Sequence, residues 1–376
     1  MCIRDRLYIV TNVTKLGFTF YICRMKLLFL FCLLAQPPTT DSLDIKVERL
    51  HDSILSVDTH NDFAMALAFP QRRSTVTKGQ VSFELMKKGR LDAAFFSAYQ
   101  EQGPCTPEGH DRAKYLADSM LRSLHRFAAE HEQLGGVAYS AGDVKALKEQ
   151  GRAAMLLSIE NAYCLGQDIS LVEHYYRTGV RMIGLTHNGN NCVADAAMDS
   201  LEIHGGLSPF GYRVIQEMNR LGMIVDVSHA SRKTCLQAVQ ASHTPVMASH
   251  SGVYNLKEIP RNLTDEEILA IAGKGGLIQI SVGRYFLSFQ PKAEVGLEHL
   301  MEHIKYVVDL VGIEHVGIGS DFDGGGGIVG VEDMGKMKAI TKALLEQGYT
   351  EDEIDKLWGG NVLRLMEEVA RNAGSF

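Results

Sequence analysis

Four histidines in this sequence stand at matching places, each at the end of a short apolar stretch. They are His60, His187, His229 and His250. Two carboxylic acids occupy similar places: Asp62 lies two residues after the first histidine, and Glu160 ends another apolar stretch. A single histidine in such a position is usually a hydrogen-bonded structural residue. Four of them together with carboxylates favour a metal site.

The spacing of these residues indicates which of them bind metal and how many ions are bound. His60 and Asp62 are two apart on a predicted strand, so their side chains point the same way and can reach one ion. His229 and His250 supply imidazoles from adjacent strands, and the carboxylate of Glu160 can touch two ions. Imidazole and carboxylate without thiolate suit Zn²⁺, and also Mn²⁺, Co²⁺ or Fe²⁺. Five candidates exceed the usual three protein ligands of a catalytic zinc, which favours two ions that share Glu160.

Such a pair of ions indicates hydrolysis. Two cations ~3.5–4 Å apart polarise a carbonyl group and lower the pKa of a bridging water toward ~7. The expected nucleophile is therefore a metal-bridging hydroxide. Nothing in the sequence suggests redox chemistry.

Short apolar runs rich in β-branched residues alternate with longer amphipathic stretches from about residue 45 onward, which is typical of βα units with a parallel sheet. We predict eight strands, over Ile54–His60, Leu91–Tyr99, Ala153–Glu160, Val180–His187, Met223–His229, Pro245–His250, Gly276–Val282 and Val316–Asp321. We predict helices over Asp111–His131, Leu171–Thr178, Pro209–Leu221, Ser231–Ala241, Asp265–Gly273, Leu297–Val311 and Glu332–Gln347. Ser208 before Pro209, and Thr264 before Glu267, have the spacing of helix starts. The pattern predicts an α/β fold of the (β/α)8 TIM-like barrel type, in which all strand ends meet at one rim.

Composition excludes several classes of protein. The chain has 376 residues, of which 45% are hydrophobic, so a disordered chain is excluded and a large core is expected. Its net charge is −7 without basic blocks, so nucleic-acid binding is not expected. Seven cysteines are too few for a disulfide scaffold.

The amino terminus resembles an export signal. Residues 1–24 have no clear pattern and are interpreted as upstream read-through, so that Met25 is the start. Residues 25–36 contain a basic start, a short apolar run and a small residue before a polar turn, as in a signal peptide. The run is too short to span a bilayer, and we expect no other membrane-spanning segment. The prediction is an exported protein, periplasmic or secreted, with membrane association left open, and with residues 45–376 as a single domain.

Several ordered motifs together are similar to one known family. They include Val57–Asp62, Gly184–Asn188, His204–Gly211, Asp226–His229, Ser249–Ser251, Pro260–Leu263, Gly319–Gly324 and Trp358–Arg364. On these motifs the chain resembles the membrane (renal-type) dipeptidases, peptidase family M19, which are binuclear zinc hydrolases. Asn161-Ala162-Tyr163 replaces the Gly-rich stretch of the animal enzymes, so the chain looks like a bacterial-type branch.

The resemblance implies a role for each candidate residue. His60 and Asp62 match the ligands of one Zn²⁺, His229 and His250 match those of the other, and Glu160 matches the bridging carboxylate. His187 matches a residue that contacts the substrate and stabilises the tetrahedral intermediate. Arg261 matches the guanidinium that binds the substrate's terminal carboxylate, and Asp321 matches the acid/base residue for the leaving amine. Two Zn²⁺ per chain, with Mn²⁺ or Co²⁺ as substitutes, and a homodimer are also implied.

Two of these roles have an alternative. Without the resemblance, Arg261 would be interpreted as a solvated cation near a helix start and Asp321 as a helix cap, and Asp323 competes for the acid role. Asp58 and Asn61 are expected to brace the ligands of the first strand, and His204 to orient a loop. Of Cys105, Cys164, Cys192 and Cys235, the sequence does not decide which pair.

The predicted function is that of a metallo-dipeptidase of the membrane-dipeptidase type, with small dipeptides as substrates. Two other functions remain open. One is a different barrel hydrolase, such as an N-acyl amino acid deacylase or a lactonase. The other is a catalytically silent, secreted metal-binding protein, although none of the candidate ligands is missing.

Overall fold

The computed structural model describes residues 42–72 and 79–374. The chain divides into two units, Met1–Lys46 and Val47–Phe376. The predicted read-through over 1–24 and signal peptide over 25–36 lie outside the described residues and stay predictions. The barrel and the candidate site lie wholly in the second unit.

One parallel sheet organises the second unit. Within the described residues its strands are β1 (Val57–Asn61), β2 (Ala93–Tyr99), β3 (Gly135–Val137), β4 (Ala153–Glu160), β5 (Val180–Gly184), β6 (Ile224–Asp226), β7 (Met247–Ser251), β8 (Leu277–Ser281) and β9 (Val316–Gly319). The order is β1-β2-β4-β5-β6-β7-β8-β9, and β3 pairs with β4 at the side. Asn61 bridges in parallel to Phe322, just after β9, and the amide of Asp62 donates to the carbonyl of Phe322 at 2.9 Å. These contacts close the sheet into a barrel.

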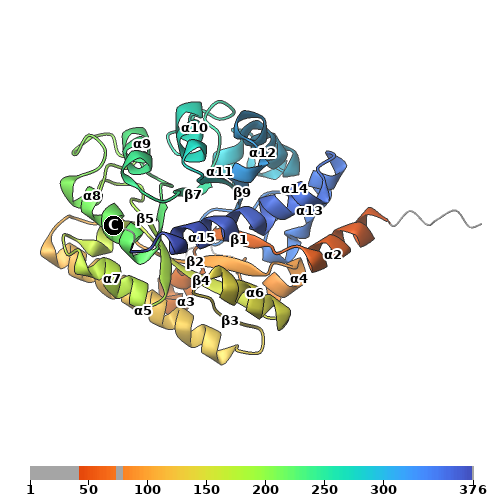
Figure 1. Ribbon diagram of the computed structural model, residues 1–376, viewed down its shortest axis with the longest axis horizontal. Coiled ribbons are helices and arrows are strands. Elements are labelled where there is room, and N and C mark those ends of the chain that lie inside the picture. Colours follow the sequence, from red (N-terminus) through yellow and green to blue (C-terminus); the bar gives the residue numbers. More distant parts are fainter. Residues whose placement is uncertain (1–41, 73–78, 375–376) are drawn as a thin grey trace, which may run out of the picture. The chain divides into compact units, whose positions relative to one another are not determined.

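Helices surround the strands of this unit (Figure 1). The α-helices are α2 (Leu43–Ser53), α3 (Phe63–Ala68), α4 (Phe83–Gly89), α5 (Pro107–Glu130), α6 (Ala141–Glu149), α7 (Ser170–Arg177), α8 (Pro209–Leu221), α9 (Arg232–Ala241), α10 (Asp265–Gly273), α11 (Arg284–Leu287), α12 (Leu297–Val311), α13 (Lys338–Glu346), α14 (Glu351–Asp355) and α15 (Asn361–Arg371). Short 3₁₀ turns lie at η1 (Pro70–Arg72), η2 (Ala162–Leu165), η3 (Lys292–Glu294), η4 (Ile313–His315) and η5 (Met334–Lys336), and η6 (Lys356–Gly360) is a π-helical turn.

The predicted α/β barrel is confirmed, and all eight predicted strands are present. The two predicted helix starts are also present. The hydroxyl of Ser208 accepts from the amide of Gly211 at 2.9 Å, and Thr264 forms a capping box with Glu267. Both pairs satisfy amides that have no partner inside the helix, which fixes the first turn.

Some boundaries and elements differ from the prediction. β5 and β6 each end three residues earlier than predicted, because the chain leaves the sheet before His187 and before His229. The expected helix over Glu332–Gln347 begins with the 3₁₀ turn η5 and becomes α-helical only in α13. The predicted elements do not include the short strand β3 or the helices α2, α3, α4, α6, α11, α14 and α15.

Two apolar clusters fill the unit, and one of them seals the end of the barrel opposite to the polar strand ends. It joins the first residues of the strands, such as Val57 and Met247, to Val362 and Met366 of α15. Figure 1 shows α15 lying across the strands. Because this end is packed with apolar side chains, the polar residues at the other ends of the strands form the open mouth.

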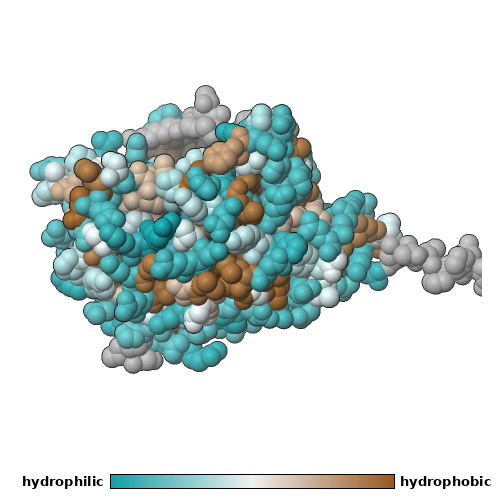
Figure 2. All heavy atoms as spheres, turned by 90° about the horizontal axis from the view of Figure 1, so that it is seen from above, coloured by the Kyte–Doolittle hydropathy of each residue, from teal (hydrophilic) through white to brown (hydrophobic). Residues whose placement is uncertain are grey.

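The face of the molecule drawn in Figure 2 is mainly hydrophilic, with several hydrophobic groups between the hydrophilic ones. In the part of the chain that the structure describes, no helix has the length and apolar character needed to cross a membrane.

Candidate active site

The structure brings the five predicted metal-binding side chains together at the mouth of the barrel, around Glu160. One carboxylate oxygen of Glu160 lies 2.9 Å from Nε2 of His229 and 3.5 Å from Nε2 of His250. The other lies 3.6 Å from Nε2 of His60, which is itself 3.7 Å from a carboxylate oxygen of Asp62. The two oxygens of one carboxylate therefore face two separate sets of donors.

Hydrogen bonds from outside fix the orientation of two of these imidazoles. The hydroxyl of Ser249 donates to Asp226 at 2.7 Å and lies 2.9 Å from Nδ1 of His250, so it accepts the Nδ1 proton. Nδ1 of His229 lies 3.0 Å from the side-chain oxygen of Asn188 and donates to it. With both Nδ1 atoms protonated, the Nε2 atoms of His229 and His250 carry lone pairs, and they lie 2.9 Å apart.

Other atoms of the cluster lack a hydrogen-bond partner. Nε2 of His60 and Oδ1 of Asp62 are buried and make no hydrogen bond to any residue that the structure describes. A buried polar atom without a partner costs about 1–3 kcal/mol, so such atoms need an explanation. Lone pairs and carboxylate oxygens that converge without protons are explained by cations between them. The donor set therefore fits divalent metal ions of the zinc type.

The protonation states of His229, His250 and Glu160 suit a metal, whereas the carboxylates of Glu160 and Asp62 outweigh burial and raise the pKa of His60 well above its usual value. Burial, with the charges of neighbouring groups, holds the pKa of His229 and of His250 well below the usual value, so both imidazoles are neutral at pH 7. Burial alone would raise the pKa of Glu160, but the adjacent His60 and His229 outweigh it and hold that pKa well below its usual range. Neutral imidazole and ionised carboxylate are the forms that bind metals.

Asp58 and Asn61 brace the strands at the site, as expected. Asp58 is buried and accepts hydrogen bonds from the amide and the hydroxyl of Ser320, each at 2.6 Å, which ties β1 to the end of β9. The side-chain amide of Asn61 donates to the carbonyl of Phe95 in β2 at 2.8 Å. The first-strand ligands are thus held by both neighbouring strands.

Four residues at the rim have left-handed backbones although none is glycine. They are Asn161, His229, Asp321 and Asp323, with φ values of 80°, 64°, 60° and 62°. Such a backbone costs of order 1–3 kcal/mol per residue and persists where the surrounding structure imposes it. At each of these residues the left-handed conformation turns the backbone sharply after a strand. At His229 and Asp321 this turn aims the side chain at the mouth.

The cluster borders a cavity of about 950 Å³ that is also lined by Arg261 and Asp321. Arg261 is buried, and its guanidinium packs 5.1 Å from the ring centroid of Phe286. Within residues 42–72 and 79–374 it makes one hydrogen bond, from Nη2 to the carbonyl of His250 at 3.3 Å. Burial lowers the pKa of Arg261 to about 10, so it remains charged at pH 7. It is a cation at the cavity wall rather than the solvated residue of the alternative interpretation.

Asp321 and His187 complete the predicted set. Burial raises the pKa of Asp321 well above its usual value, and Asp62 and Glu160 add to this, so its carboxyl group holds a proton more readily than an exposed one. His187 lies 4.0 Å from Glu160 and its ring packs edge-on against Tyr99, with centroids 4.7 Å apart. Both could also bind metal themselves. The ligand atoms of Asp321, His60 and His250 lie within 4.8 Å of one another, and so do those of His187, Glu160 and His229.

Asp323 and His204 have other partners. The amide of Gln80 donates to Asp323 at 3.1 Å, and the amide of Asp323 donates back to the side chain of Gln80 at 3.0 Å, so Asp323 braces a loop. Nε2 of His204 lies 2.8 Å from the carbonyl of Asn191, in keeping with the expected role in orienting a loop.

Sequence reasoning missed residues that act through the backbone. Lys257 is buried, and its amine donates to the carbonyls of Arg284, Tyr285 and Ser288 at 3.1, 2.6 and 2.6 Å. It thereby holds the short helix α11, which carries Phe286. A lone lysine in a loop carries no sequence signal for this. Asp226 begins the motif Asp226–His229, and its position before His229 indicates a bracing role.

Comparisons with known proteins found a matching family and several similar proteins. The chain matches the family described as membrane dipeptidase (peptidase family M19) over residues 45–375. It is 35% identical over 343 residues to dipeptidase aclJ of Aspergillus oryzae, covering 88% of this chain and 81% of that protein.

Two solved bacterial structures are also similar. The probable dipeptidase PvdM of Pseudomonas aeruginosa is 30% identical with a TM-score of 0.81, covering 89% of this chain and all of that one. A metallopeptidase of Rhodobacter sphaeroides, described as liganded with a phosphinate mimic of the dipeptide L-Ala-D-Ala, is 26% identical with a TM-score of 0.75, covering 84% and 99%. Fungal and bacterial proteins both appear among these relatives, so the bacterial-type branch stays a prediction.

Proposed function

This chain belongs to the membrane dipeptidase family, peptidase family M19, and from that premise we propose that it hydrolyses dipeptides with two Zn²⁺ ions per chain. Family membership assigns it to the metal-dependent dipeptidases. The number and identity of the ions are our proposal. The observation that carries it is the arrangement of Glu160, whose two oxygens face His229 with His250 on one side and His60 on the other.

These distances support the following ligand set. His60 and Asp62 would hold one ion, His229 and His250 would hold the other, and Glu160 would offer one carboxylate oxygen to each. When bound, the pair of cations supplies a hydroxide nucleophile near neutral pH and polarises the scissile carbonyl. Mn²⁺ and Co²⁺ accept the same donors and are expected to substitute for zinc.

The remaining residues bind the substrate and move a proton. Arg261 binds the α-carboxylate of the dipeptide, because a guanidinium matches a carboxylate with two parallel hydrogen bonds. Asp321 gives a proton to the departing amine, for which its raised pKa prepares it. His187 donates from the cavity wall to the oxygen that becomes negatively charged during attack. A longer peptide places a neutral peptide bond at Arg261, which explains a limit to dipeptides.

A metal and substrate assay tests the proposal. We expect about two equivalents of zinc in the purified protein, loss of Ala-Ala hydrolysis after treatment with a chelator, and recovery with Zn²⁺, Mn²⁺ or Co²⁺. N-acyl amino acids and lactones, tested at the same concentration, are expected to react far more slowly. Faster turnover of either class would replace the dipeptidase assignment, and chelator-resistant turnover would remove the metal from the mechanism. Export and dimer formation stay predictions from the sequence.

A further inference from the structure

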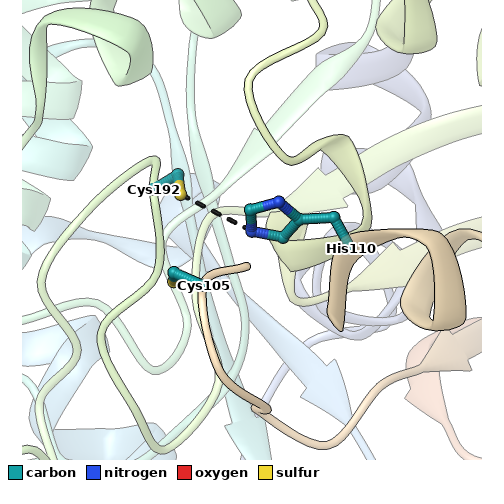
Figure 3. A group of neighbouring side chains, drawn as sticks. All are labelled: Cys105, His110 and Cys192. Carbon is teal, nitrogen blue, oxygen red and sulfur yellow. Dashed lines mark hydrogen bonds between the residues drawn. The ribbon is translucent and has the colours of Figure 1, made fainter. Parts of the chain in front are cut away.

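A second group of potential metal ligands lies outside the five residues around Glu160. Cys105, His110 and Cys192 offer two sulfur atoms and one ring nitrogen that all lie within 4.8 Å of one another. Figure 3 shows the imidazole of His110 directed at Cys192, with Cys105 on the neighbouring loop. Sγ of Cys192 is 3.6 Å from Nε2 of His110. Among the described residues, all four cysteines are free thiols.

The three residues come from separate segments whose conformations are fixed independently. Cys105 precedes α5, and His110 lies in its first turn, which is set by Pro107 and by the hydroxyl of Thr106, which accepts from the amide of Gly109. Cys192 lies in the loop between β5 and α8, where the hydroxyl of Ser208 donates to the carbonyl of Cys192 at 2.6 Å. The approach of the donors is therefore built into the fold rather than produced by one flexible loop.

Neighbouring contacts hold the group in place on the side of the cavity. The hydroxyl of Tyr163 donates to the carbonyl of Pro104 at 2.6 Å, and the ring of Tyr163 packs edge-on against His110 with centroids 5.2 Å apart. Cys105 is exposed, whereas His110 and Cys192 are half-buried. An ion from solvent can thus reach a site whose imidazole and one sulfur are already positioned.

We propose that Cys105, His110 and Cys192 bind a third cation, a thiophilic ion of the zinc type, separate from the candidate active site. Two thiolates and one imidazole form a soft donor set that selects Zn²⁺ over Mg²⁺ or Ca²⁺. Three protein ligands of a tetrahedral ion leave the fourth position for water. The five residues around Glu160 include no sulfur, so the two sites differ in chemistry.

The protonation states of His110 and Cys105 without a bound ion agree with this proposal and make the affinity for the cation depend on pH. Burial lowers the pKa of His110, which keeps its imidazole neutral and able to bind an ion. Partial burial of its thiol and the neighbouring thiol of Cys192 raise the pKa of Cys105 to about 11. A cation must therefore displace thiol protons, so its affinity falls as the pH is lowered.

The location suggests what the ion does. Gly103, Pro104 and Gly109 line the cavity beside the candidate active site, and they flank Cys105 and His110 in the chain. Cys192 belongs to the segment after His187, which follows β5. An ion bound to all three residues fastens the loop between β2 and α5 to the loop between β5 and α8, and so holds the cavity mouth.

Cobalt absorption tests the site without reference to activity. The full chain is purified without reductant, freed of metal, and titrated with Co²⁺. Thiolate bound to Co²⁺ gives a near-ultraviolet charge-transfer band that histidine and carboxylate ligands do not give. We expect the band in the wild type and its loss in Cys105→Ser and Cys192→Ser. Cys164→Ala, which removes a cysteine outside the group, is expected to keep it.

Further measurements separate this proposal from the proposed function and from simpler alternatives. His110→Ala is expected to weaken Co²⁺ binding at the band by roughly tenfold or more, while the sulfur-free site keeps its metal. The band does not depend on dipeptide turnover, so either proposal can fail alone. Absence of the band with both thiols free overturns this one. So does a Cys105–Cys192 disulfide, seen as two thiols that react with maleimide in denaturant only after reduction.

Discussion

Replacement of Arg261 by methionine is expected to remove recognition of the substrate carboxylate. Methionine has a similar length and fits the apolar contact with Phe286, so the cavity wall is kept. The charge and the donors that Arg261 directs into the cavity are lost. Because Arg261 uses one hydrogen bond on the carbonyl of His250, its other N–H groups are available for a carboxylate.

The size of the effect follows from the number of hydrogen bonds. A hydrogen bond to a charged group contributes about 1.5–3 kcal/mol, so a two-pronged contact contributes about 3–6 kcal/mol. At about 1.4 kcal/mol for each factor of ten, kcat/KM for Ala-Ala falls by roughly 10²–10⁴. The zinc content is expected to stay at the wild-type level, because Arg261 is not among the proposed ligands.

A dipeptide amide provides the matched substrate. Ala-Ala-NH₂ lacks the negative charge, so the wild-type enzyme is expected to lose a similar factor on it, and Arg261→Met is expected to lose little more. Steady-state kinetics of both enzymes on both substrates give the coupling between guanidinium and carboxylate. If the variant loses the same factor on the amide as on the acid, the residue does not bind the carboxylate and the reasoning is refuted.

Three further predictions concern the acid, the rim and the scaffold. Asp321→Asn keeps the left-handed backbone, which asparagine tolerates; it is expected to lower kcat by roughly 10²–10⁴, and an unchanged kcat would exclude Asp321 as the acid. Gly324→Ala would place its Cβ 1.9 Å from the carboxylate of Asp62, so elemental analysis should find less metal, whereas Gly273→Ala, which meets nothing within 4 Å, should retain it. Burial lowers the pKa of His303 to about 4. Between pH 6.5 and 4 this histidine is protonated in the unfolded chain but stays neutral in the folded one. The free energy of unfolding therefore decreases by about 3 kcal/mol as the pH falls through this range. Urea unfolding in chelator at both ends of this range should show that loss in the wild type, and a clearly smaller one in His303→Gln.

The strands and the ligands were predictable because they rest on local patterns. A buried parallel strand is an apolar run such as Ala153–Glu160, and its bounds in the sequence and in the structure agree. In a parallel barrel the carboxyl ends of all strands meet at one rim. The sequence alone therefore predicts that Glu160, His229 and His250 lie together.

Other parts depend on long-range contacts that no local pattern contains. The helix α3 has six residues and no side-chain cap, and β3 has three residues, so neither has a sequence signature. Lys257 positions α11 through three carbonyl groups, which only the fold brings within reach. The proximity of Cys105 to Cys192 likewise follows from two loops that start on different strands.

The left-handed backbones at His229 and Asp321 also bear on how this chain evolves. Each position imposes a conformational penalty that glycine would not incur. Selection for turnover must therefore keep residues that thermostability alone would remove. A descendant released from that selection should drift toward glycine or asparagine at these two places first. Such replacements would mark a gene copy that has kept its barrel and given up its chemistry.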